Sequence, residues 1–149
     1  MPTLRELDAH LLQWQPETTT ERDGHGMWVF RDEQGEPELW SPYGPTRDVF
    51  VPVATLQEAH GIRFLCPKNF AKNGGAAGTH STYVWFASSP VPGHLGRNKK
   101  GQTVRWTVMP GSTGIDDLSL TPSIQEQDEG ACGWHGFVGS NGVPRGSAA

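Results

Sequence analysis

The residues best suited to chemistry in this chain are its two cysteines and the histidines nearest to them. Cys132 and His135 are separated by two residues within the stretch GACGWHGFVGSNGV, residues 130–143. Thiolate and imidazole groups are ligands that zinc prefers, and a glycine-rich turn leaves backbone amides free to point at a sulfur atom. Cys132 and His135 therefore form one usable pair of metal ligands.

The second candidate pair lies earlier in the chain. Cys66 precedes Pro67, and His80 follows fourteen residues after Cys66, beyond a glycine-rich loop. A Cys-x-x-Cys unit would have its second cysteine at position 69, where this chain has Asn69, so His80 has to complete the set. The two pairs predict a closed tetrahedral site for structural zinc with the ligands Cys66, His80, Cys132 and His135. The alternative is that the thiols are buried apolar groups and the imidazoles form ordinary hydrogen bonds.

An open metal site is a further alternative. Without His80 as a ligand, three protein ligands would leave a coordination position for water, as in metal-dependent hydrolases. Such an enzyme needs a general base, which the loops before Cys132 could supply from Asp116, Asp117, Glu126, Asp128 or Glu129. The simpler interpretation is that these carboxylates are solvated loop charges. Because the sequence has no His-Glu-x-x-His, Gly-x-Ser-x-Gly or phosphate-loop motif, it favours a protein that is not an enzyme.

Two resemblances bear on these residues. The segments FLCPKN, GGAAGTHS, VWF, RWTV, DLSLTPSI and CGWHGFV occur in that order within residues 62–138. On them the chain resembles an uncharacterised family of small phage and bacterial proteins, and this resemblance implies a phage or prophage origin and metal binding. The segment CGWHGF also resembles the second half of a Rieske motif, whose cluster uses two Cys and two His. The first half, Cys-x-His, is absent at Cys66, and a Rieske-type [2Fe–2S] electron carrier is kept as an alternative.

Composition limits the class of protein. The net charge of −4 and the pI of about 5.8 argue against a nucleic-acid partner. No apolar run reaches the roughly 20 residues that span a bilayer, and the N-terminus lacks the apolar core of a signal peptide. We therefore expect a cytoplasmic accessory protein with no membrane partner, which binds an unidentified protein in the host cell. Association with a virion and the oligomeric state are left open.

The predicted fold is a single α+β domain over residues 1–149. Residues 1–61 would form an N-terminal helix and hairpin region, and residues 62–143 a metal-binding β region with a mostly antiparallel sheet or small sandwich, stabilised by zinc. Nineteen glycines and twelve prolines predict many turns and short strands.

The N-terminal helix is predicted from a capping box and an apolar stripe. Thr3 and Glu6 match the Thr-x-x-Glu pattern, and Gln15-Pro16 would end the helix. Between them, apolar residues recur at intervals of three and four, at Leu4, Leu7, Leu11 and Trp14. A second match, Thr55 to Glu58, predicts a helix of one or two turns before Gly61.

Strands are predicted where β-prone runs alternate with turn residues. Residues 27–30 and 38–40 flank the turn-forming Asp32–Pro37 and predict a hairpin, and residues 49–53 predict an edge strand because they contain Pro52. Further short strands are predicted over 62–65, 82–87, 103–109 and 118–120, and Asn141-Gly142 is typical of a hairpin turn. Core positions are expected at Trp85, Trp106, Leu118, Leu120 and Ile124.

Overall fold

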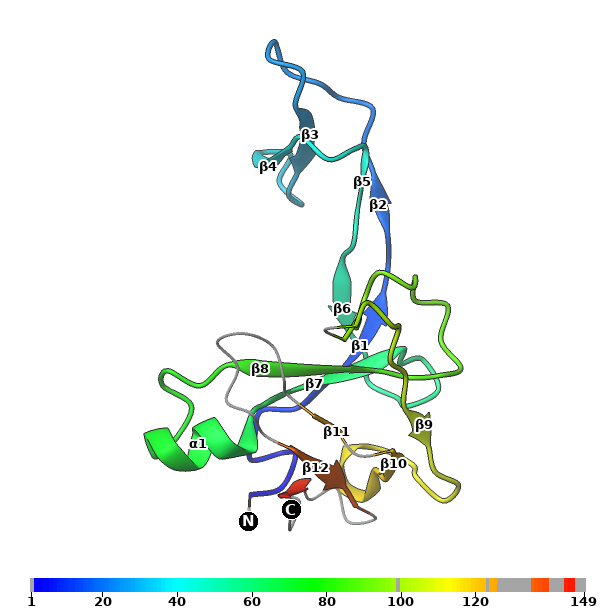
Figure 1. Cartoon of the computed structure of the whole chain (residues 1–149). Coiled ribbons are helices and arrows are strands. Elements are labelled where there is room, and N and C mark those ends of the chain that lie inside the picture. The colour runs from blue at the N-terminus through cyan, green and yellow to red at the C-terminus, as the bar shows by residue number, and fades with distance from the viewer. Residues whose placement is uncertain (1, 99, 123, 126–134, 140–143, 147–149) are drawn as a thin grey trace. The chain divides into compact units, whose positions relative to one another are not determined.

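A computed structural model describes residues 2–98, 100–122, 124–125, 135–139 and 144–146 (Figure 1). The chain divides into two compact units. Unit 1 consists of Met1–Gln13 and Pro52–Ala149, and unit 2 consists of Trp14–Val51. Each unit is described by itself.

The main sheet has four strands in the order β6-β1-β7-β8. Their bounds are Phe50–Pro52 for β6, His10–Trp14 for β1, Gly61–Leu65 for β7 and Ser81–Trp85 for β8. The central strand β7 pairs antiparallel with both β1 and β8 and has the sequence GIRFL, which is largely buried. The edge position of β6, which contains Pro52, confirms the prediction for that segment.

The rest of unit 1 consists of short elements beside this sheet. A seven-residue helix, α1 (Pro67–Asn73), connects β7 to β8. The later elements are β9 (Thr107–Val108), the 3-10 helix η1 (Ile115–Asp117), β10 (Leu120–Thr121), β11 (Ile124–Gln125), β12 (His135–Val138) and β13 (Pro144–Gly146). β9 pairs with β10, and β11, β12 and β13 form a small antiparallel sheet. Asn141-Gly142 lies outside the described residues, although the strands on either side of it do pair.

One hydrophobic core serves unit 1. It joins the leucines of the N-terminal segment, the apolar residues of β7 and β8, Cys66, and apolar residues from β10, β11 and β12. The expected core positions are confirmed, because the following side chains are all buried: Trp85, Trp106, Leu118, Leu120 and Ile124.

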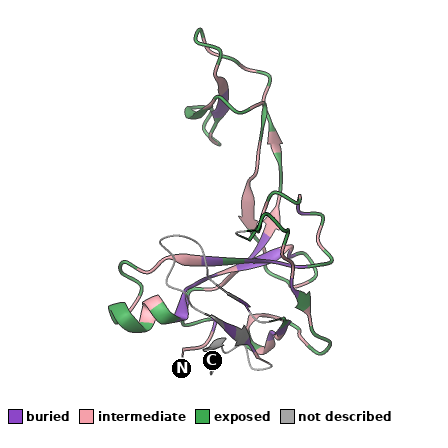
Figure 2. Cartoon of the chain, in the orientation of Figure 1, coloured by how far each residue is buried: buried purple, intermediate pink, exposed green. Residues whose placement is uncertain are grey.

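Unit 2 contains two small antiparallel ladders. β2 (Glu17–Thr18) pairs with β5 (Thr46–Arg47), and β3 (Trp28–Arg31) pairs with β4 (Pro37–Ser41). The second pair is the predicted hairpin. Its buried apolar side chains are those of Val29 and Phe30, and most of unit 2 is exposed or half-buried (Figure 2).

The predicted N-terminal helix is wrong. Residues 4–8 form a turn, and the chain then enters strand β1. The capping contacts do form, since Glu6 N donates to Thr3 Oγ1 at 3.2 Å and Thr3 N donates to Glu6 Oε1 at 3.3 Å. They close only one turn, because Asp8 has φ 54° and residues 10–12 pair with β7. Leu4, Leu7 and Leu11 are buried as expected, but from a turn and a strand.

The α+β class is wrong for the same reason: the described residues are mostly β-structure with one short α-helix. At Thr55–Glu58 the amide of Glu58 donates to Thr55 Oγ1, as in a capping box, and the Thr55 hydroxyl donates to Glu58 Oε1, but these bonds lie in a turn. The helix that does occur, α1, lies in a segment expected to be a loop. Its signals were Pro67 at the first helical position and Gly74, which ends the helix in the left-handed conformation (φ 69°). No helix among the described residues has the length and apolar character needed to cross a membrane.

Candidate functional site

Two of the four predicted metal ligands lie opposite each other in unit 1. The backbone amide of Cys66 donates to the carbonyl oxygen of His80 at 2.9 Å, which extends the β7–β8 ladder by one residue beyond the pair Leu65 and Ser81. Opposed residues of an antiparallel ladder project their side chains to the same face. Cys66 is fully buried within the core, and His80 is half-buried. The ladder therefore places Cys66 and His80, which are fourteen residues apart in sequence, opposite each other.

The connection between β7 and β8 makes this placement possible. Cys66 is the residue before α1, and Gly74 turns the chain back at the end of the helix. The returning loop is held by Thr79, whose hydroxyl donates to the carbonyl of Gly75 at 2.7 Å and accepts from the side-chain Nδ2 of Asn73 at 3.2 Å. These contacts fix the residue that immediately precedes His80.

The second predicted pair is described only in part. Cys132 lies outside the described residues, and His135 is the first residue of β12, where its Cα is paired with that of Gln125 in β11. Val138 of β12 and Ile124 of β11 are buried in the cluster that also contains Cys66. The strand that carries His135 is thus built into the same core as Cys66. Within the described residues no group of three or more His, Cys, Asp or Glu side chains is arranged so that it could hold a metal ion, and the four-ligand site stays a prediction.

The carboxylates expected as a general base are engaged elsewhere. Asp116 forms a two-pronged ion pair with Arg5, with both N–O distances at 2.9 Å, and this hydrogen bonding lowers the pKa of Asp116. Asp117 accepts from the hydroxyl and amide of Thr113 and from the amide of Gly114, which lowers the pKa of Asp117. Both carboxylates therefore have structural roles. Glu126, Asp128 and Glu129 lie outside the described residues.

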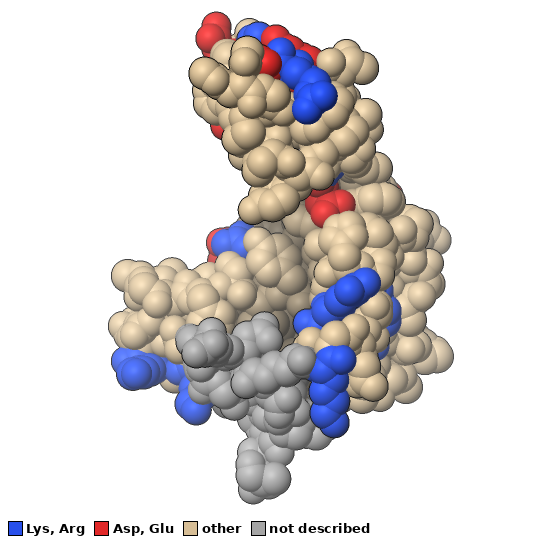
Figure 3. All heavy atoms as spheres, turned by 45° about the horizontal axis from the view of Figure 1, so that its top comes forward, with Lys and Arg blue, Asp and Glu red and all other residues tan. Residues whose placement is uncertain are grey.

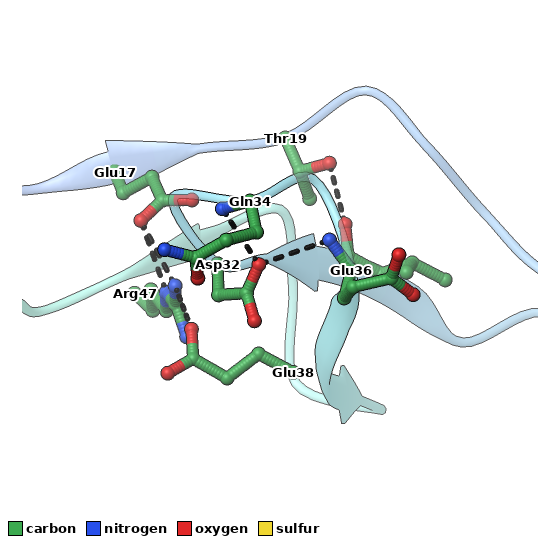
Figure 4. Close-up of polar contacts among 8 residues, drawn as sticks. Glu17, Thr19, Asp32, Gln34, Glu36, Glu38 and Arg47 are labelled. Carbon is green, nitrogen blue, oxygen red and sulfur yellow. Dashed lines mark hydrogen bonds and ion pairs between the residues drawn. The ribbon is translucent and has the colours of Figure 1, made fainter.

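A cluster around Arg47 in unit 2 was not predicted. Its guanidinium donates to Glu17 at 3.0 and 3.2 Å and to Glu38 at 2.8 Å, so one cation joins β2, β4 and β5 (Figure 4). The same guanidinium lies 4.9 Å from the ring centre of Phe30, and the Arg47 side chain is only 20% exposed. Burial would lower the pKa of Arg47, but the hydrogen bonds to Glu38 and Glu17 outweigh burial and raise it. The cluster links three strands of unit 2 through one guanidinium.

A second ion pair and an open cavity adjoin this cluster. Arg31 donates to both oxygens of Glu21 at 2.7 and 2.8 Å. The hairpin turn is closed by Asp32, whose Oδ1 accepts from the amides of Gln34 and Glu36, both at 2.9 Å (Figure 4). Beside it lies a cavity of about 590 Å³ lined by the following residues: Glu17, Arg31, Asp32, Glu33, Gln34, Glu38, Arg47, Asp48, Val49 and Phe50. Five carboxylates and two guanidinium groups line it, so the cavity is acidic.

The charge of the chain is concentrated in unit 2. Residues 14–51 contain eight Asp and Glu against three Arg, a net charge of −5, whereas the rest of the chain contains eight acidic and nine basic residues, a net charge of +1. Acidic and basic side chains lie close together on the surface of unit 2 (Figure 3). The net charge counted separately for each segment could have revealed this unit. The net charge of the whole chain does not show the difference between the two units.

Unit 2 also carries exposed apolar side chains. Leu39 and Trp40 of β4 are 40% and 50% exposed, and Tyr43, just after the strand, is 96% exposed. Single exposed apolar residues are ordinary, but these three lie within five residues of one another on a unit with a very small core. Unit 2 therefore combines exposed aromatic side chains with a negative net charge. No protein-family model, curated protein or solved structure matches this chain.

Proposed function

We propose that this chain is a non-enzymatic zinc-binding protein that acts by binding another protein. The observation that carries the zinc proposal is the pairing of Cys66 with His80 across the end of the β7–β8 ladder. A buried cysteine paired with a histidine across a ladder can supply half of a Cys2His2 ligand set. In the proposal, Cys132 and His135 supply the other half.

The bound zinc would have a structural role. Its ligands would connect the end of β7–β8 to the segment leading into β12, two parts of the chain that already share a core. Metal-binding energy is folding energy in small metal-binding domains, because the ligands are brought together only when the chain folds. A glycine- and proline-rich chain with short strands gains most from such a cross-link.

The non-enzymatic role is supported by the surroundings of the candidate site. Asp116 and Asp117, two of the carboxylates expected to serve as a general base, are occupied by Arg5 and by backbone amides. The resemblance of residues 62–138 to small phage and bacterial proteins supports a phage or prophage origin as part of this proposal. The binding role is supported by the exposed aromatic residues and the negative charge of unit 2.

The zinc proposal is tested by elemental analysis of the freshly purified full-length protein. We expect about one zinc per chain and no visible colour, since zinc has a filled d shell. Replacing zinc with cobalt should give the absorption of a tetrahedral site with thiolate ligands, and this measurement needs no mutation. His80→Ala and Cys132→Ser should lose the metal, and Cys132→Ser should lose several kcal/mol of stability.

The matched control is His25→Ala, since His25 lies in an exposed turn of unit 2 and should leave the zinc content unchanged. The proposal is overturned if the purified protein contains no metal and takes up no zinc when it is refolded in the presence of zinc. Iron with a red-brown spectrum would replace it with the Rieske-type electron carrier.

A further inference from the structure

We propose that the β3–β4 hairpin of unit 2 is the docking site for an extended, positively charged segment of a protein partner, which adds as a strand along β4. This inference rests on the proposed binding role and names the surface and the chemistry of the partner. It does not depend on zinc.

The backbone of β4 has an unpaired edge. Among the strands that the structure describes, β4 has β3 as its only neighbour. Residues 37–40 are all exposed. Natural proteins usually protect an edge strand with a bulge, a proline, a short length or a covering element. β4 begins at Pro37, and its pairing with β3 shifts register between Phe30 and Arg31, so one end of the strand is protected. Residues 39–41 pair regularly with β3, and their outer edge can accept an added strand from another chain.

The side chains of β4 offer apolar surface beside that edge. Trp40 lies opposite Val29 in the ladder and is half exposed, and Leu39 lies opposite Phe30. Trp and Tyr are the side chains most often found at the centre of protein interfaces. Unit 2 buries only Val29 and Phe30 within its 38 residues, and a unit of this size rarely has a sufficient core by itself. A strand placed on β4 would cover Leu39 and Trp40 and enlarge that core.

Charge complementarity selects the kind of segment. Unit 2 has a net charge of −5, and the turn beside β4 carries the exposed carboxylates of Glu33 and Glu36. The acidic cavity of about 590 Å³ opens next to Glu38 of β4 and has room for a basic side chain. Successive side chains of an added strand point to opposite faces. A segment in which Lys or Arg alternates with apolar residues therefore fits, with its apolar side chains toward Trp40 and its cations toward the carboxylates.

The test uses a defined probe and the full-length protein. A fluorescein-labelled peptide of alternating Lys and Val is titrated with the protein and followed by fluorescence anisotropy. The comparison peptide has Glu in place of every Lys. We expect saturable binding of the lysine peptide, weakening as salt rises because the attraction is screened. We expect no binding of the glutamate peptide.

Variants locate the site. Trp40→Ala should weaken binding by about tenfold or more, as for a central aromatic residue of an interface. The double variant Glu33→Gln, Glu36→Gln should weaken binding several-fold and reduce its salt dependence. Tyr83→Ala is the matched control, because Tyr83 is similarly exposed but belongs to β8 in unit 1. A thermal melt of each variant checks that it is folded.

A two-dimensional NMR spectrum recorded with and without the lysine peptide needs no mutation. The backbone amide signals that shift on peptide binding should belong to residues 28–48. The proposal is overturned if the lysine peptide does not bind, if both peptides bind equally, or if Trp40→Ala binds like the parent. It is also overturned if the parent is a dimer that Trp40→Ala makes monomeric, since a second copy would then be the occupant. Peptide binding by a protein that holds no zinc would refute the metal proposal alone, and a zinc-loaded protein that ignores the peptide would refute this inference alone.

Discussion

Replacing Gly61 with alanine tests how closely β7 and β8 must approach to align Cys66 with His80. Gly61 is paired with Trp85 at the far end of the same ladder. A Cβ atom on Gly61 would lie 2.4 Å from Cε3 of Trp85 and 2.6 Å from the carbonyl oxygen of Val84. Non-bonded carbon atoms are normally at least about 3.5 Å apart, so the indole or the strand has to move by about 1 Å.

The size of the effect depends on this overlap. Adding a methyl group to a tightly packed site costs about 1–3 kcal/mol, because neighbouring side chains leave their preferred rotamers or the backbone shifts. Trp85 is buried, so its ring has little free space to move into. For a chain of this length each kcal/mol corresponds to about 2–4 °C in Tm. We therefore expect Gly61→Ala to lower Tm by roughly 2–12 °C.

Thermal and urea unfolding of the parent and its variants measure the effect. Gly114→Ala is the control, because Gly114 has extended backbone and no atom among the described residues lies within 4 Å of the added Cβ. We expect this variant to change the stability of the protein by about 0.5 kcal/mol or less. The double variant Gly61→Ala, Trp85→Leu should lose less stability than the sum of the losses in the two single variants, since the indole ring that clashes is gone. Close packing of Gly61 on Trp85 is refuted if Gly61→Ala has the same Tm as the parent. It is also refuted if the losses of stability in the two single variants add up to the loss in the double variant.

Three other perturbations address separate features. Arg47→Ala should destabilise unit 2 by about 1–3 kcal/mol, because Glu17 and Glu38 would be left as neighbouring carboxylates without their shared cation. Amide hydrogen exchange in residues 14–51 should become faster, and unchanged exchange would contradict this prediction. Arg105→Met should lower the free energy of unfolding in urea by about 1–3 kcal/mol, since the Arg105 guanidinium donates to four backbone carbonyls in residues 91–104. A variant as stable as the parent would mean that water replaces these hydrogen bonds. The pKa of Asp117 is lowered by a side-chain hydroxyl and by backbone amides, so the stability it contributes is present above its unfolded pKa of about 4 and is lost as pH falls below that value. Asp117→Asn should therefore flatten the decline of Tm in acid, and an identical pH profile would argue against this contribution.

Features that depend on neighbouring residues could be predicted from the sequence. The hairpin of β3 and β4 was predicted because a Gly- and Pro-containing turn separates two β-prone runs. At both capping-box matches the backbone amide of the glutamate donates to the threonine hydroxyl as expected, since this bond joins residues only three apart. The burial of Leu118, Leu120 and Ile124 was also predicted, because apolar residues leave water whichever partner covers them.

The element that each local signal leads into was decided by the tertiary structure. The residues after Thr3–Glu6 could continue as a helix, but residues 10–14 gain hydrogen bonds and burial as strand β1, beside β7. This partner lies about fifty residues away, and the apolar spacing of Leu4, Leu7 and Leu11 fits either outcome. Helix formation in proteins depends more on such packing than on propensity.

The sites divide in the same way. The types of residue that bind metal were evident in the sequence, but the pairing of Cys66 with His80 exists only because α1 returns the chain to the β7–β8 ladder. The convergence of Glu17 and Glu38 on Arg47 likewise requires two ladders to fold around one cation. By itself the sequence determined the residue chemistry and the local turns of this protein. Which of those groups meet was decided by the tertiary structure, because long-range contacts depend on how all the strands pack together.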